Sequence, residues 1–163
     1  MSQLARFEKR IHDCIPLSHA LGMKLEAYDG RQLMVSAPLA PNRNHQNTAF
    51  GGSLYAVAVT AAWGLVELLL QDAALEGRVV VQTGEMTYVE PVDDDFFALC
   101  ELPDESFLGK FHKSLARHGK GRMELTSRIY RGQATLTPPG EPRAIFRGRF
   151  VVQEAHTTPV LMI

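Results

Sequence analysis

The stretch NRNHQNTAFGGSLYAVAVTAAWGLVELLL, residues 42–70, changes from polar to almost wholly apolar at Gly51-Gly52. The apolar part predicts a helix over about residues 53–72, with Ser53 as its N-cap. A helix that is apolar on every side is enclosed either by a protein core or by lipid. The run is short for a span of about 20 residues and contains a glutamate, so we expect a core helix and no membrane span.

The segments around this helix show helical and strand patterns in turn. Asp29-Gly30, between two alternating runs, is a strong hairpin signal. Tight turns favour an antiparallel sheet, and a helix that is apolar all round needs a sheet curved about it. We therefore expect an α+β fold in which one antiparallel sheet wraps a long central helix. The expected elements are an amphipathic helix at 3–14, strands at about 23–28, 31–38, 78–90, 96–102, 121–130 and 143–153, and a short helix within 104–119.

Length and composition are those of one globular domain. The chain has 163 residues, 45% of them hydrophobic, and a net charge of -1, which provides no basic surface for nucleic acid. We expect one domain over residues 1–163, with a core at about 15–153 and a loose tail at 154–163. Two cysteines in apolar settings and a start without an apolar leader favour a reduced, cytoplasmic protein. No His/Cys grouping has metal-ligand spacing, so we expect neither a metal nor a cofactor.

Three motifs together resemble a known family. They are NTAFGGSLYAVAVTAAWGL at residues 47–65, MTYVEP at 86–91 and IFRGRFVV at 145–152. With the order of elements, they resemble the hotdog-fold thioesterase superfamily over about residues 15–153, and most closely the thioesterase domain at the C-terminus of YiiD-type proteins. The resemblance implies a hotdog fold, hydrolysis of acyl thioesters, and a homodimer or a dimer of dimers.

The superfamily pattern Asn-x5-His-Gly-Gly-x6-Asp matches Asn44-x5-Phe50-Gly51-Gly52 in spacing. Phe50 stands where a histidine is common, and Val59 stands where the familiar catalytic carboxylate is expected. The resemblance implies an oxyanion hole at the helix N-terminus, where unpaired amides point outward and glycines let a carbonyl approach. Close packing of the helix on the sheet is the alternative explanation of the two glycines.

Because the familiar carboxylate is missing, another group has to activate water. Residues 79–89 alternate, and Glu85 lies on the same predicted face as Val79 and Val81. If that face meets the central helix, burial raises the pKa of Glu85 and suits it to act as a general base. A bulge at Gly84 would instead expose the carboxylate, and a structural ion pair is a further alternative.

Other polar groups supply the remaining expected contacts. Asn44 would orient the attacking water or the carbonyl, unless its side chain only caps a loop turn. The basic segment RHGKGR at residues 117–122 suits the phosphates of coenzyme A or of a carrier-bound phosphopantetheine, although such charges also protect edge strands. The expected substrate-binding residues are Phe50, Asn47, Thr60, Lys120 and Arg122.

Three functions are compatible with these features. The first is hydrolysis of acyl-CoA or carrier-bound acyl thioesters, with Glu85, Asn44, Gly51 and Gly52 as catalytic residues. The second is a non-catalytic acyl-CoA-binding or partner-interaction module, which the missing helix carboxylate favours. The third is a hydratase or dehydratase, whose paired aspartate is absent from PNRNH at residues 41–45. Fold alone does not decide among them.

Overall fold

The computed structural model describes residues 1–154, so the predicted tail lies beyond the described residues from residue 155 onward. All the predicted helices and strands are present. The structure adds the short helix α2 and a 3₁₀ turn at Ala40–Asn42. The helices are α1 (Gln3–Cys14), α2 (Pro16–Ala20), α3 (Gly51–Asp72) and α4 (Glu105–His118), and the strands are β1 (Lys24–Tyr28), β2 (Gln32–Ala37), β3 (Arg78–Tyr88), β4 (Phe96–Glu101), β5 (Lys120–Arg131) and β6 (Ala144–Gln153).

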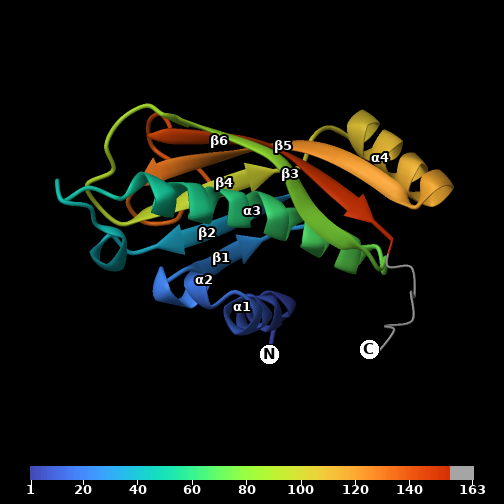
Figure 1. Cartoon of the computed structure of the whole chain (residues 1–163), viewed down its shortest axis with the longest axis horizontal. Coiled ribbons are helices and arrows are strands. Elements are labelled where there is room, and N and C mark those ends of the chain that lie inside the picture. The colour runs from blue at the N-terminus through green and yellow to red at the C-terminus, as the bar shows by residue number, and fades with distance from the viewer. Residues whose placement is uncertain (155–163) are drawn as a thin grey trace, which may run out of the picture.

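The six strands form one antiparallel sheet in the order β1-β2-β4-β5-β6-β3. The sheet curves around α3, and α1 and α2 lie on the opposite side of that helix (Figure 1). Helix α4 packs against β5, at the end of the molecule where that strand begins. The predicted α+β architecture, a sheet wrapped about a central apolar helix, is confirmed.

Helix α3 is the core of this arrangement. Val57, Ala61 and Leu65 have no exposed surface. Phe7 of α1 stacks on Trp63 with ring centroids 5.9 Å apart, a contact that stabilises by about 0.5–1.5 kcal/mol beyond the buried area. By length and composition α3 would also suit a membrane span, but most of it is buried, so it is the core helix of a soluble fold.

The start of α3 differs from the prediction. The N-cap is Phe50, whose backbone is extended and whose carbonyl accepts from the amides of Ser53 and Leu54 at 2.9 and 3.1 Å. Ser53 was the wrong cap, because the helix already begins at Gly51 and the serine is buried in its first turn. No side chain caps this helix, which leaves its first amides open.

Strands β6 and β3 differ in how regularly their faces are buried. On β6, Phe146, Phe150 and Val152 share one face, and none of them has exposed surface. On β3, the register shifts between Val81 and Thr83, so the period-two face does not continue past Val81.

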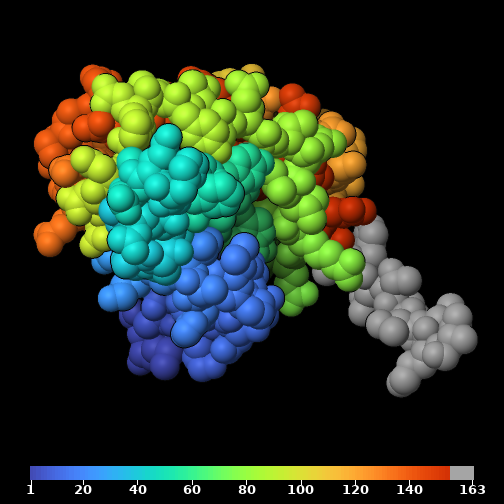
Figure 2. Space-filling model, turned by 60° about the vertical axis from the view of Figure 1, so that its left-hand side comes forward, coloured from blue at the N-terminus to red at the C-terminus, as the bar shows by residue number. Residues whose placement is uncertain are grey.

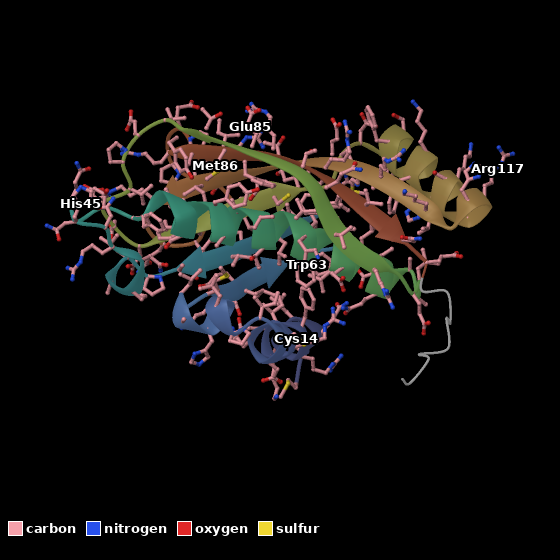
Figure 3. The ribbon with its side chains drawn as sticks, in the orientation of Figure 1. Cys14, His45, Trp63, Glu85, Met86 and Arg117 are labelled. Carbon is pink, nitrogen blue, oxygen red and sulfur yellow. The ribbon has the colours of Figure 1, made fainter. Side chains whose placement is uncertain are left out.

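Beyond the shift, the side of β3 that meets α3 changes. A Cβ added to Gly84 would lie 2.2 Å from Tyr55 Oη on α3, so Gly84 faces that helix. Met86 packs on the core, whereas Glu85 is exposed. Figure 3 places Glu85 on the side of β3 away from α3. The condition that the face of Glu85 meets the central helix is therefore not met. A bulge exposes the carboxylate, as the alternative expected, although it lies between Val81 and Thr83 and not at Gly84.

Candidate active site

Two backbone donors are open at the N-terminus of α3. Within residues 1–154, the N–H groups of Gly51 and Gly52 make no hydrogen bond to the protein, whereas the next two amides bond to the carbonyl of Phe50. The helix dipole adds partial positive charge at this end. The geometry suits a carbonyl oxygen or an oxyanion, which needs convergent donors in a fixed position.

The same glycines also make room for two aromatic rings. A Cβ on Gly51 would lie 3.2 Å from the ring of Tyr88, whose hydroxyl donates to the Gly51 carbonyl at 2.9 Å. A Cβ on Gly52 would lie 2.4 Å from the ring of Phe50, which is 59% exposed. Packing therefore explains part of the glycine requirement, while the amides remain free.

The loop before α3 is held by two asparagines with different tasks. The Asn44 carboxamide oxygen accepts from the amides of Gln46 and Thr48 at 2.9 and 3.1 Å, and its nitrogen donates to the Thr48 hydroxyl at 3.0 Å. Its side chain thus closes its own loop, as the alternative interpretation expected. Asn42, which sequence reasoning missed, is buried, and its carbonyl accepts from the amide of Phe50 at 2.7 Å. It therefore fixes the entry to α3.

A small cavity of about 240 Å³ lies beside Gly51. Glu90 is the carboxylate in its lining, and it forms an ion pair with Arg143. Glu90 was overlooked because it follows the end of β3, although the motif MTYVEP contains it. The cavity is lined by Thr48, Ala49, Gly51, Leu54, Tyr88, Val89, Glu90, Pro91 and Val92.

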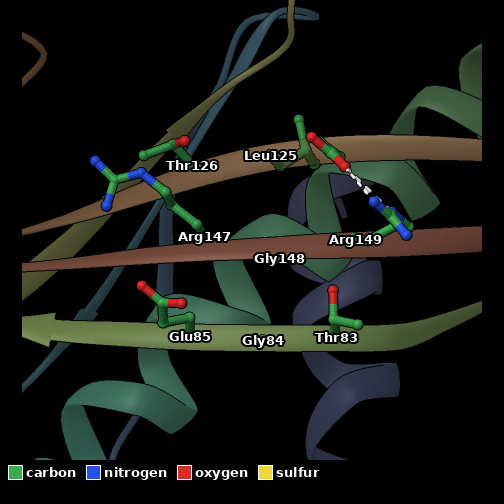
Figure 4. A pocket seen from close by; sticks show the side chains of 9 residues that line it. Thr83, Gly84, Glu85, Leu125, Thr126, Arg147, Gly148 and Arg149 are labelled. Atoms are coloured by element: carbon green, nitrogen blue, oxygen red, sulfur yellow. Dashed lines mark hydrogen bonds and ion pairs between the residues drawn. The ribbon is translucent and has the colours of Figure 1, made fainter.

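Glu85 belongs to a different surface. It projects from β3 on the outer face of the sheet, opposite Arg147 of β6, in a shallow depression that also contains Thr126 and the ion pair of Arg149 with Glu124 (Figure 4). This face lies across the sheet from α3. The structure therefore does not bring Glu85 to the open amides within one subunit.

An apolar groove runs along the exposed side of α3. It has a volume of about 430 Å³ and contains Thr60, one of the predicted substrate contacts, together with Val59 and Trp63. Val59, which replaces the familiar carboxylate, thus adds an apolar surface to the groove. Ala56 adds to the floor on α3. The wall residues come from the N-cap of α2, α2 itself, the following turn and β3: Ile15, Leu17, Ser18, Met23, Val79, Val80 and Val81.

The basic residues expected to bind phosphate lie far from the open amides. Lys120 is level with Arg78 through the ladder β5–β6–β3, whereas Tyr88, ten residues further along β3, contacts Gly51. At about 3.3 Å per residue the separation is roughly 33 Å. In Figure 3, His45 of the entry loop and Arg117 of α4 lie at opposite ends of the molecule.

The remaining predicted residues have clear surroundings. Asn47 is exposed at the tip of the entry loop with a positive φ of 61°, so it forms the turn. Lys120 and Arg122 share a surface depression of about 420 Å³ with Phe107. The glutamate in α3, Glu67, is paired with Arg10 at 2.6 Å.

Comparison with known proteins agrees with this fold. The family described as "Putative thioesterase (yiiD_Cterm)" matches residues 4–154. A solved structure of a protein of unknown function from Chlorobaculum tepidum is 37% identical, with a TM-score of 0.86 over 92% of this chain and 93% of that one. A structure from Shewanella oneidensis, described as a "putative thioesterase", is 27% identical, with a TM-score of 0.75 over 91% of this chain and 95% of that one.

A thioesterase from Haemophilus influenzae is 15% identical, with a TM-score of 0.68 over 94% of this chain and 92% of its own, and shows the fold alone. The family match covers nearly all of the described residues. The predicted resemblance to hotdog thioesterases is confirmed, and the chain belongs to the YiiD C-terminal thioesterase family.

Proposed function

We propose that this protein hydrolyses acyl thioesters at the N-terminus of α3. The observation that carries the proposal is the pair of unpaired amides at Gly51 and Gly52, at the head of a helix with an apolar groove along it. The thioester carbonyl accepts hydrogen bonds from these amides, which then stabilise the oxyanion of the tetrahedral intermediate. Water adds to the carbonyl carbon, the C–S bond breaks, and a carboxylic acid and a thiol leave.

Glu90 is the carboxylate that this mechanism favours as the base. It lines the cavity beside Gly51, and Arg143 holds one of its oxygens. The other oxygen makes no hydrogen bond within the described residues, so it is free to take a proton from water. Glu85 and Asn44 stay predictions as catalytic groups, with less support, because Glu85 lies on the outer face and Asn44 is bonded to its own loop.

The proposed active form is a homodimer paired along β3. This strand is at one edge of the sheet, so one row of its backbone groups has no partner strand. Apolar side chains are open toward both ends of the strand: Val80 is 55% exposed, Val81 46% and Tyr88 53%, and Val89, just past the strand, 54%. An unpaired backbone row with open apolar side chains at each end favours pairing with a second copy. Antiparallel pairing about a two-fold axis near the middle of β3 would join two sheets into one.

Pairing along β3 would also bring the basic residues into use. It would place the partner subunit's Arg78 level with Tyr88 of the first subunit, beside Gly51. The partner subunit's Lys120 would then lie three strand spacings away, about 14 Å. The pantetheine arm of coenzyme A, about 13 bonds long, extends over roughly 15 Å. One molecule of acyl-CoA would thus reach the amides of one subunit and the cations of the other.

The second candidate function is that of an acyl-CoA-binding module, which would be cytoplasmic like the hydrolase. Free thiols at Cys14 and Cys100 support a reducing compartment for either function. The observation that favours the module is Val59, which leaves the exposed side of α3 without the superfamily's carboxylate at that position. Binding without hydrolysis would need the same groove and the same cations.

Release of free thiol from a series of acyl-CoA esters, and from the same acyl groups on a phosphopantetheine carrier, distinguishes the candidates. A thioesterase releases thiol in proportion to enzyme for at least one series. If no ester of any chain length is hydrolysed while calorimetry detects acyl-CoA binding, the binding module replaces the hydrolase.

A further inference from the structure

We infer that the apolar groove along α3 holds the acyl chain, and that Trp63 closes its far end and limits the chain to about 8–12 carbons. The assignment rests on the proposed hydrolysis at Gly51 and Gly52, and it adds the class of acyl group. The groove is the surface lined by Ile15, Leu17, Ser18, Met23, Ala56, Val59, Thr60, Trp63, Val79, Val80 and Val81.

The shape of the groove suits a chain. Its floor is the exposed side of α3, one wall is α2 with the following turn, and the other wall is the start of β3. Figure 2 shows α3 set back between the N-terminal helices and β3 on this side of the molecule. A volume of about 430 Å³ lies within the range of ligand pockets, about 300–1,000 Å³.

The chemistry of the lining favours an alkyl group. Among residues 1–154, no charged side chain lines the groove, and its two hydroxyl groups already donate hydrogen bonds. Thr60 Oγ1 donates to the carbonyl of Ala56 at 2.7 Å, and Ser18 Oγ donates to the carbonyl of Ile15 at 2.7 Å. A polar ligand would find no free hydroxyl hydrogen there, so its desolvation would not be compensated.

The groove leads from the open amides. Gly52, Ala56 and Trp63 follow one another at spacings of four and seven residues, which places them on one side of α3. Thr60 lies between Ala56 and Trp63 on the same side. A carbonyl held at Gly52 therefore has its acyl chain directed along this side of the helix, toward Trp63.

Trp63 forms the end wall. Its indole Nε1 donates to the carbonyl of Val79 at 3.1 Å, which ties α3 to β3 across the groove, and Phe7 stacks behind the ring. Gly52 and Trp63 are about 16 Å apart along the helix axis. Helical side chains lean toward the N-terminus of the helix. With the Trp63 ring one helical turn closer to Gly52 than its backbone is, roughly 11 Å of groove length remain for the chain. An extended chain advances about 3.3–3.6 Å per three bonds, so roughly ten bonds fit.

The groove is distinct from the edge at which a second copy would pair. Strand pairing uses the backbone groups at the edge of β3. The floor of the groove, at Val59 and Thr60, lies deeper than the side chains that form the two rims of the groove. Leu17 on one rim is 58% exposed and Val80 on the other 55%. A second copy along β3 would therefore roof the groove and leave its interior for the chain.

The first test is kcat/KM for CoA thioesters with acyl chains of 2 to 16 carbons. For the wild type we expect a rise of up to about four-fold per added methylene, as each is buried, and a fall beyond about 12 carbons. Val59→Phe should shift the optimum to shorter chains and Trp63→Ala to longer ones. Leu136→Ala, which removes an exposed apolar side chain outside the groove, is the matched control and should keep the wild-type profile.

The short-chain rate separates the two proposals. If no thioester of any length is hydrolysed, the proposed function fails. If butanoyl-CoA is hydrolysed but chain length and Val59→Phe have no effect on kcat/KM, the groove assignment is overturned while hydrolysis stands. The groove assignment is also overturned if Val59→Phe changes the oligomeric mass but leaves the chain-length profile of kcat/KM unchanged. Trp63→Ala also removes a hydrogen bond and a stacked ring, so Val59→Phe is the deciding variant.

A second readout does not depend on activity. Trp63 is the one tryptophan of the chain, so its fluorescence reports on the end of the groove. S-decyl-CoA, a thioether that cannot be hydrolysed, should shift the emission to shorter wavelength with saturation, and coenzyme A alone should not. An emission spectrum that stays unchanged at saturating S-decyl-CoA would overturn the assignment.

Discussion

The two sides of α3 are equally apolar in sequence but differ in the structure. The side toward the sheet is fully buried, as at Val57, Ala61 and Leu65. The opposite side, from Gly52 through Ala56 to Trp63, is only partly covered. A helix needs one apolar side to fold onto a sheet, so the second apolar side is available for another partner. The buried side accounts for stability, and the open side is where we place the substrate.

The largest expected effect is on the open side. Gly52→Val puts a branched side chain beside the amides, so kcat should fall by about 10²–10³, as when an oxyanion donor is removed. Gly109→Val is the matched control, because a Cβ at this helical glycine meets nothing within 4 Å. Full activity in a folded Gly52→Val variant, with thiol release as the readout, would remove the oxyanion site from consideration.

The next effect separates two carboxylates. Glu90→Gln keeps the shape of the residue and removes the proposed base, so kcat should fall by about 10² with little change in KM. Glu85→Gln is the control on the outer face of the sheet and should retain wild-type kcat. If Glu85→Gln lowered kcat and Glu90→Gln did not, Glu85 and not Glu90 would be the base.

Substitutions on the buried side of α3 should lower the free energy of unfolding. Leu65→Ala leaves a cavity in the core, so the free energy of unfolding should fall by about 2–5 kcal/mol, while kcat for a short-chain thioester is unchanged. Val59→Ala on the open side should cost less, because its side chain is only half-buried. Urea denaturation measures both. Equal losses for the two variants would contradict the division between the sides.

The edge of β3 should control assembly. Val80→Lys adds a charge to the apolar edge and should shift the molar mass, measured by light scattering, toward the monomer. Leu136→Lys changes a residue of similar exposure away from that edge and should not. A wild type that is monomeric at assay concentrations would contradict the proposed dimer, whereas a tetrameric mass would indicate a dimer of dimers.

The smallest expected effect concerns the basic residues. Lys120→Ala with Arg122→Ala should raise KM for acyl-CoA by about three- to ten-fold, and added salt should do the same to the wild type, because exposed charges are screened. Acyl groups on N-acetylcysteamine, which carries no phosphate, provide the control and should show no change. An unchanged KM for acyl-CoA would leave these residues as a solvated edge only.

Interior elements were predictable from the sequence. On β6, which has a neighbour on each side, burial fixes which face Phe146 and Phe150 occupy, so alternation alone identified it. On β3, an edge strand, the ladder tolerates a bulge after Val81, and a shift of one residue turned Glu85 outward. Gly84 indicated that a bulge was possible, but whether it forms, and at which residue, depends on the backbone.

The candidate site was only partly predictable. The glycine pair was identified because its spacing and the helix pattern coincide. Asn42 and Glu90 were missed, because their positions depend on how the loop and the end of β3 fold against α3. Asn44 was predicted as a catalytic group, yet its side chain bonds locally within the loop of residues 44–48, which is a common use of asparagine.

The central claim is that the amides of Gly51 and Gly52 hold the thioester carbonyl. The most direct test is infrared spectroscopy of a bound ketone analogue of decanoyl-CoA, in which a methylene replaces the sulfur and the carbonyl carbon is ¹³C. Two helix N-terminal donors should lower the carbonyl stretching frequency below its value in water, and Gly52→Val, but not Gly109→Val, should abolish the shift. A bound analogue whose carbonyl absorbs as it does in water, or is unaffected by Gly52→Val, would contradict the claim.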